Sequence, residues 1–161
     1  CHLVKFDVDF FQKGNTPTNL VKLLSDKKIS KIFHFARFDL AIIKKFLNVS
    51  CENVFCTKIA SKLVRTYTDK HGLKDLCKEL LGIDLNKSQQ CSDWSSDDLS
   101  NNQISYAASD VIYLNELKKK LVEMLKREER LDLANKVFAF LNTRIDLDIL
   151  GWDGQDIFSH S

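Results

Sequence analysis

The chain has 161 residues, 44% of them hydrophobic and 29% charged, and its formal net charge is +2. This composition excludes a disordered chain, and the length suits a single domain over residues 1–161 with a core of its own. No apolar run approaches the ~18 residues of a membrane span and no signal-peptide pattern is present, so no membrane partner is expected.

Five cysteines are present, an odd number with no C-x-x-C spacing. Free thiols in a reducing compartment are therefore favoured over a zinc site or a disulfide framework, and a cytoplasmic location is expected. Cys56 is interpreted as a buried structural thiol. The near-neutral net charge neither requires nor excludes nucleic acid as a partner.

Strands and helices alternate in the first half of the chain. Thr16 and Pro17 are typical of an N-cap and a first helical position, and the compact apolar run 29–33 is typical of a buried strand. Strands are expected at 2–6, 29–33 and 53–55, and helices at 17–27, 40–47 and 57–65.

Helices dominate the second half. One runs from about Leu73 to Gly82, which closes it, and a polar loop around Trp94 follows. Ser100 and Gln103 form a capping-box start for a helix that continues to about 127, and an amphipathic helix covers 131–141. The pattern predicts an α/β fold with a small sheet.

Two places could carry chemistry. Tyr106 and Asp110 are four residues apart, so their side chains project from the same side of one helix, as a catalytic pair or by coincidence. Asp39 stands where an apolar strand ends and a helix begins, the edge at which α/β folds present ligands. Taken alone, it is either a partner of the helix dipole or a metal ligand.

Four segments resemble a known family. Phe33-His-Phe-Ala-Arg-Phe-Asp39 and Tyr106-Ala-Ala-Ser-Asp110 are similar to the second and third motifs of the DEDDy 3′–5′ exonucleases, in the ribonuclease D group. His71-Gly-Leu-Lys-Asp-Leu76 and Ser92-Asp-Trp94 resemble further segments of that group. The resemblance extends over nearly the whole chain.

The resemblance implies a ribonuclease H-like fold, a mixed sheet flanked by helices, and a metal-dependent 3′–5′ exonuclease. It makes Asp39 and Asp110 metal ligands and Tyr106 the phenol that orients the attacking water. Phosphodiester hydrolysis by two metal ions agrees with these residue types, because one ion activates water and the other stabilises the leaving oxygen. Hard carboxylate oxygens suit Mg²⁺ or Mn²⁺.

The chain departs from the family at the first motif, an Asp-x-Glu on an early strand. No Asp-x-Glu precedes Asp39, and Asp7 and Asp9 are not expected to replace it. We expect truncated N-terminal strands, a longer parent protein, and weak metal binding with no activity for these 161 residues alone. The accessory helical nucleic-acid-binding domain of ribonuclease D is not expected in this chain either.

Candidate contacts to nucleic acid are basic side chains near the expected site: His34, Arg37, His71 and Lys74, with Arg65, Lys70 and Lys87 as further possibilities. Phosphate binding and ordinary solvated charge are both open for each of them. Phe35 and Phe38 could stack on a terminal base, but their spacing favours the core.

The leading hypothesis is an exoribonuclease that removes nucleotides from single-stranded 3′ ends, as in the processing of tRNA or other small RNAs, with DNA as a possible substrate. The alternative is a catalytically incomplete module that keeps the nuclease fold and binds nucleic acid or a partner without cleaving. The sequence does not indicate the oligomeric state.

Overall fold

The computed structural model describes every residue except 5–9, 11–12, 86–91, 97 and 161. Two of the elements, η1 and η2, are short π-helical segments that continue an α-helix. The elements in chain order are α2 (Thr18–Ser25), β1 (Lys31–Phe33), α3 (Ala36–Leu47), β2 (Val54–Cys56), α4 (Thr57–Val64), α5 (Leu73–Leu76), η1 (Cys77–Leu81), α6 (Asn101–Ile112), α7 (Leu114–Arg127), α8 (Leu131–Leu147) and η2 (Asp148–Trp152).

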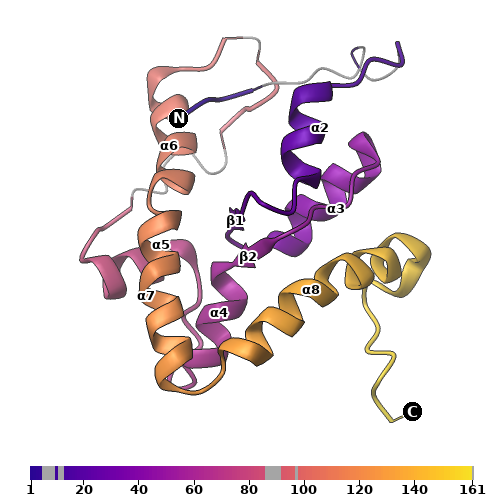
Figure 1. The fold of residues 1–161 in the computed structure, drawn as a ribbon. Coiled ribbons are helices and arrows are strands. Elements are labelled where there is room, and N and C mark those ends of the chain that lie inside the picture. Colours follow the sequence, from indigo (N-terminus) through magenta and orange to yellow (C-terminus); the bar gives the residue numbers. More distant parts are fainter. Residues whose placement is uncertain (5–9, 11–12, 86–91, 97, 161) are drawn as a thin grey trace.

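β1 and β2 form a parallel pair at the centre of the molecule, with α3 as the connection between them (Figure 1). Ile32 lies opposite Phe55, and Phe33 lies opposite Cys56. A parallel pair requires a crossover of this kind, because the chain must return to the same end of the sheet. Both strands and the helix between them agree with the sequence-based prediction. Of the expected mixed sheet, the described residues contain this parallel part.

The core lies between this pair and the later helices. α7 contributes Leu117, Leu121 and Leu125, each fully buried. Their spacing of four residues places them on one face, which packs against α4 and reaches β1. α8 packs against α3 and β2 (Figure 1). There Phe138 packs against Phe55 in a tilted arrangement, with ring centroids 4.9 Å apart.

The later helices differ from the prediction in two ways. The single helix expected from Ser100 to 127 is broken at Tyr113, which caps both α6 and α7. Each part has its own packing, because α7 buries four leucines whereas Gln103 is the one buried residue of α6 among those described. α8 extends past the predicted end at 141 as far as Leu147, and η2 continues it.

The predicted first strand is not seen in its described part, since residues 2–4 have no regular structure and residues 5–6 lie outside the described residues. The four cysteines of the described ranges, Cys1, Cys51, Cys56 and Cys77, are free thiols, as expected. None of the helices in those ranges is both long and apolar enough to cross a membrane.

Candidate active site

The site is built at the carboxyl ends of β1 and β2. His34 and Phe35 follow β1, and Thr57 and Lys58 follow β2, so the parallel pairing places them at the same edge of the sheet. Thr57 Oγ1 donates to the Phe33 carbonyl at 3.2 Å and lies 2.9 Å from His34 Nδ1. When the single hydroxyl proton is used on the carbonyl, Nδ1 carries a proton and donates to Thr57.

A cavity of about 580 Å³ opens at this edge, and its walls come from distant parts of the chain. Asp39 reaches it from the first turn of α3, and Tyr106 and Asp110 reach it from α6. Of the described residues, thirteen line it: Ile32, Phe33, His34, Phe35, Asp39, Lys58, Leu73, Lys74, Leu85, Tyr106, Asp110, Val111 and Leu114.

The carboxyl group of Asp39 is held in an environment that disfavours its charge. Burial raises its pKa to about 6, and a backbone hydrogen bond opposes this rise only in part. A carboxylate kept at the wall of a cavity against this cost is well placed to receive a cation, which would restore the charged form.

The start of α3 has an unusual backbone that shapes the cavity wall. Phe35 has a φ of 68° and a ψ of 46°, in the left-handed region, which costs a residue other than glycine about 1–2 kcal/mol. The next residue, Ala36, is fully buried and donates its N–H to Cys56 Sγ at 3.4 Å. This contact confirms the interpretation of Cys56 as a buried structural thiol, and it anchors the helix that carries Asp39.

α6 starts with the predicted capping box, which also positions Tyr106. Ser100 Oγ accepts from the Gln103 N–H at 3.3 Å, and Gln103 Oε1 accepts from the Ser100 N–H at 2.9 Å. The amide nitrogen of Gln103 donates to the Asp93 carbonyl at 2.8 Å, which ties the preceding segment to the helix. The Trp94 ring then lies beside the Tyr106 ring, with centroids 6.0 Å apart.

Five of the seven candidate site residues therefore line one cavity: His34, Asp39, Lys74, Tyr106 and Asp110. Arg37 does not line it. Its guanidinium donates to both carboxylate oxygens of Asp148 at 2.5 and 2.7 Å, and this pairing raises its pKa. A phosphate contact from Arg37 stays a prediction, because its strongest partner in the structure is an aspartate of η2.

His71 also lies outside the residues that line the cavity. Its Nδ1 is 2.9 Å from Ser61 Oγ, which accepts a hydrogen bond from buried Arg65 at 2.9 Å. Burial, followed by the nearby Arg65 and Lys62 cations, lowers the pKa of His71. The ring is thus favoured in its neutral form, with Nδ1 accepting from the serine hydroxyl. Its role in nucleic acid binding stays a prediction.

Lys58 is a charged residue of the cavity that the sequence-based prediction missed. It follows β2 as His34 follows β1, so the end of the second predicted strand was the available signal.

The prediction that Phe35 and Phe38 belong to the core is wrong, since their exposed fractions are 47% and 61%. The left-handed turn at Phe35 directs its ring outward, where Lys58 Nζ lies 4.3 Å from the ring centroid. Asp7, Asp9 and Lys87 lie outside the described residues.

The donor atoms of the cavity are of the chemical type that a hard divalent cation prefers. Asp39 and Asp110 bring carboxylate oxygens to the same cavity, and Mg²⁺ is commonly held by one or two carboxylates together with water and substrate phosphates. In the described parts of the chain, no group of three or more His, Cys, Asp or Glu side chains is placed to hold a metal. The two carboxylates that the described residues bring to the cavity thus suit one ion.

Comparisons with known proteins agree with this geometry. Residues 2–126 match the family model described as a 3′–5′ exonuclease. Ribonuclease D of Gluconacetobacter diazotrophicus is 36% identical over 135 residues, which cover 84% of this chain and 34% of that protein. The chain spans about a third of the length of the curated ribonuclease D relatives.

Solved structures extend the agreement to the fold. Brucella melitensis NrnC is 55% identical with a TM-score of 0.85, covering 89% of this chain and 69% of that one. Escherichia coli RNase D is 25% identical with a TM-score of 0.73, covering 80% of this chain and 34% of that one. The fold and the site thus define a helix-rich α/β domain of the ribonuclease H-like fold, with carboxylates at the sheet edge. The chain belongs to the 3′–5′ exonuclease family, among its ribonuclease D-like members.

Proposed function

We propose that this chain is the nuclease domain of a metal-dependent 3′–5′ exoribonuclease that shortens single-stranded 3′ ends. The observation that carries the proposal is the convergence of Asp39, Tyr106 and Asp110 on one cavity. A phenol beside carboxylates at the edge of a sheet suits hydrolysis of a phosphodiester by a positioned water. Small RNAs, tRNA among them, are the proposed substrates, with DNA as a possible second substrate, and the cytoplasm is the proposed location.

Each group of the cavity has a role that its position supports. Asp39 and Asp110 hold Mg²⁺ or Mn²⁺, and a bound ion of this kind supplies charge stabilisation and an activated water. Tyr106 orients the water through its hydroxyl, because the neighbouring Trp94 ring and the capping box fix where the phenol lies. His34 and Lys74, which both line the cavity, contact phosphate groups, as positively charged or donating groups do.

The relatives support the choice of substrate. Structures of Brucella melitensis NrnC exist with bound Mg²⁺ and with bound pGG. Escherichia coli RNase D is described as an exoribonuclease involved in structured RNA processing. By analogy, a short single-stranded RNA end is the substrate that we assign to this cavity.

A second candidate function is a nucleic-acid-binding module without cleavage. It is favoured by the small number of carboxylates, since the described ranges hold no group of three or more metal-ligating side chains. A two-ion site with two carboxylates leaves the ions poorly compensated, because unit charges ~4 Å apart interact by about 4 kcal/mol at an effective dielectric near 20. Under this alternative the intact protein binds an oligoribonucleotide and leaves it intact in millimolar Mg²⁺.

Substitution of Asp110 tests the exonuclease. Asp110→Asn removes an anionic ligand while keeping the shape of the side chain, so we expect turnover of a 5′-labelled oligoribonucleotide by the intact protein to fall by at least about 10²-fold. Calorimetric titration with Mg²⁺ should show a weaker site, and circular dichroism should show an unchanged fold.

Asp132→Asn is the matched control, because this aspartate is 80% exposed on α8 and pairs with Lys136. It should leave both turnover and Mg²⁺ affinity unchanged. Full turnover by the Asp110→Asn protein rejects the catalytic assignment, and an intact protein that binds RNA without cutting it favours the module.

A further inference from the structure

A second cavity of about 290 Å³ lies beside the first, between the start of α3, the outer face of α4 and the face of α8 that meets them. We refer to it as the α4–α8 groove. Its charged lining residues are Arg37, Lys58, Lys62 and Arg144, and its aromatic lining residues are Phe35 and Phe140.

The groove adjoins the active-site cavity. Phe35 and Lys58 line both, so these two side chains form the common wall. They also contact each other, with Lys58 Nζ 4.3 Å from the Phe35 ring centroid. The left-handed backbone at Phe35 holds this ring at the surface, with 47% of the residue exposed. A chain leaving the first cavity on this side therefore passes over an aromatic ring and an ammonium group.

The charge of the groove has one sign. Among the described residues that line it there is no carboxylate. Arg37 and Arg144 both pair with Asp148, which lies just outside the lining. Lys58 and Lys62 are four residues apart on α4, so they project from the same side of the helix. These two lysines leave the groove with excess positive charge.

The position of Lys58 itself favours an anion. It lies in the first turn of α4, at the positive end of the helix dipole, where a cation is disfavoured by roughly 0.3–1 kcal/mol. A phosphate bound there would interact favourably with both the dipole and the lysine. Phe140, 40% exposed on α8, supplies a second aromatic surface beyond the two lysines, and the Phe158 ring lies beside it with centroids 6.4 Å apart. Positive charge combined with exposed rings is the arrangement by which proteins hold single-stranded nucleic acid.

We propose that the α4–α8 groove binds the nucleotides that precede the 3′-terminal one in a single-stranded nucleic acid, with phosphates on Lys58 and Lys62 and a base against Phe140. The proposal rests on the proposed function, which places the terminal nucleotide in the first cavity. It predicts that affinity rises with oligonucleotide length, because a dinucleotide leaves most of the groove empty.

Lys62 gives the sharpest test, since it lines the groove and not the active-site cavity. Binding of unlabelled RNA of two and of seven nucleotides is measured by calorimetry in EDTA, which prevents cleavage. For the longer RNA, Lys62→Glu should weaken binding about tenfold and lower the dependence of log K on log salt by about one. Phe140→Ala should weaken the same binding about fivefold or more through lost stacking. Both variants should bind the dinucleotide as the wild type does.

Lys126→Glu makes the same charge change at an exposed position on α7 that lines neither cavity, so it should bind both RNAs normally. The groove is ruled out if Lys62→Glu and Lys126→Glu bind the longer RNA equally well. It is also ruled out, with the proposed function intact, if the wild type binds both RNAs with one affinity. A wild type that binds neither RNA in EDTA also rules out the groove, whereas the metal-dependent turnover measured with Asp110→Asn decides the proposed function separately. Equal melting temperatures verify that the variants are folded.

Discussion

Asp39 must be ionised to hold a cation, yet its half-buried position raises its pKa to about 6. The ordinary value of 3.8 applies once the chain unfolds, so the folded protein binds this proton more tightly. The stabilising contribution of the neutral acid is complete below about pH 4 and is lost as the pH rises through about 6. At neutral pH the metal-free protein therefore bears the cost of a desolvated carboxylate.

Asp39→Asn should therefore make the metal-free protein more stable at pH 7.5, by about 1–3 kcal/mol in the free energy of unfolding. At pH 4 the variant and the wild type should be alike, because the wild-type side chain is then neutral. Urea unfolding in EDTA at several pH values measures both differences. Adding Mg²⁺ should stabilise the wild type and not the variant. An Asn variant with the same advantage at pH 4 as at pH 7.5 contradicts this account.

Tyr106 is expected to act through its hydroxyl alone. Tyr106→Phe keeps the ring that lies beside Trp94, so the cavity should keep its shape while the water loses a hydrogen-bonding partner. We expect kcat of the intact protein to fall roughly 10- to 100-fold with Mg²⁺ affinity unchanged. Tyr113→Phe is the control, since Tyr113 follows α6 and does not line the cavity. A large loss of Mg²⁺ affinity in the Tyr106 variant argues against an orienting role.

At the scale of the element, α6 depends on Gln103 for two separate tasks. The side chain closes the capping box and also holds the Asp93 carbonyl, next to the ring that packs on Tyr106. Gln103→Ala should cost about 1 kcal/mol or more of unfolding free energy, and Ser100→Ala, which removes the cap alone, should cost less. Only the Gln103 variant should alter the fluorescence of Trp94, measured with Trp152→Phe in both proteins. Equal spectra for the two variants contradict the second task.

Local rules account for the elements that could be predicted. The two strands follow from contiguous apolar runs, and the start of α6 follows from two side chains three residues apart. Both features could therefore be predicted from the sequence. The break at Tyr113 has no glycine or proline to indicate it. It arises because α7 packs its leucines against α4, a contact between distant parts of the chain.

Part of the candidate site could be predicted from motifs along the chain, and part of it could not. Asp39, Tyr106 and Asp110 lie in motifs that resemble a family, whereas Lys58 has no motif and enters the cavity through the pairing of β1 with β2. Phe35 was assigned to the core because helical spacing assumes a helical backbone, and its left-handed conformation turns the ring outward. The place of Lys58 and the direction of the Phe35 ring both depend on the folded backbone. The spacing of residues along the chain does not predict either of them.

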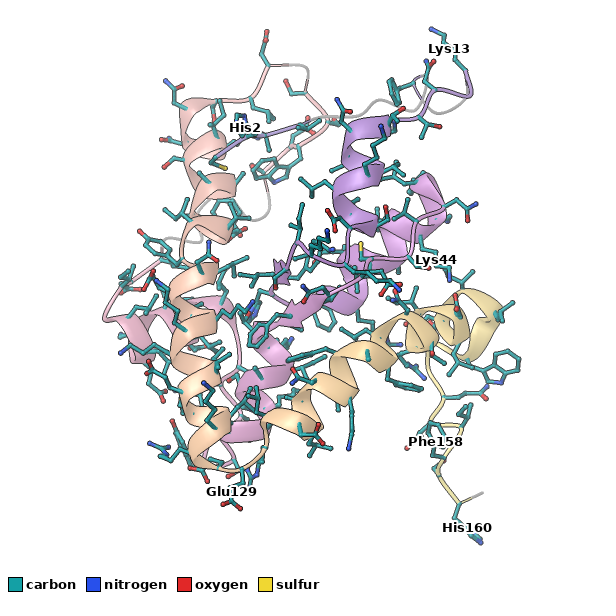
Figure 2. All side chains as sticks on the ribbon, in the orientation of Figure 1. His2, Lys13, Lys44, Glu129, Phe158 and His160 are labelled. Carbon is teal, nitrogen blue, oxygen red and sulfur yellow. The ribbon has the colours of Figure 1, made fainter. Side chains whose placement is uncertain are left out.

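At the scale of the whole molecule, one carboxylate joins the C-terminal segment to α3, the helix that carries Asp39. Asp148 in η2 is 12% exposed and pairs with Arg37 in the first turn of α3 and with Arg144 on α8. The two arginines also donate to carbonyls of the segment that follows, at Trp152, Asp153 and Gln155. Nearby, Lys44 of α3 pairs with Asp146 of α8. Further along the C-terminal segment, the ring of Phe158 lies beside Phe140 of α8, with centroids 6.4 Å apart, before the chain continues to His160 (Figure 2).

Asp148→Asn should therefore destabilise the protein more than the loss of a surface ion pair does. Two arginines, 37% and 21% exposed, would face each other without their shared anion, at a cost of roughly 1–3 kcal/mol in the free energy of unfolding. Asp146→Asn is the matched control, because Asp146 is 49% exposed and its pair with Lys44 should contribute under about 1 kcal/mol.

The effects of the two substitutions should also differ in their dependence on salt. Ions screen exposed charges well and partly buried ones poorly, so 0.5 M NaCl should abolish the effect of Asp146→Asn and leave most of the effect of Asp148→Asn. Urea unfolding at low and high salt measures all four differences. Because Arg37 lies two residues before Asp39, the Asp148 variant should also bind Mg²⁺ more weakly than the Asp146 variant. Equal unfolding free energies for the two variants would mean that the carboxylate does not hold the end of the chain to α3.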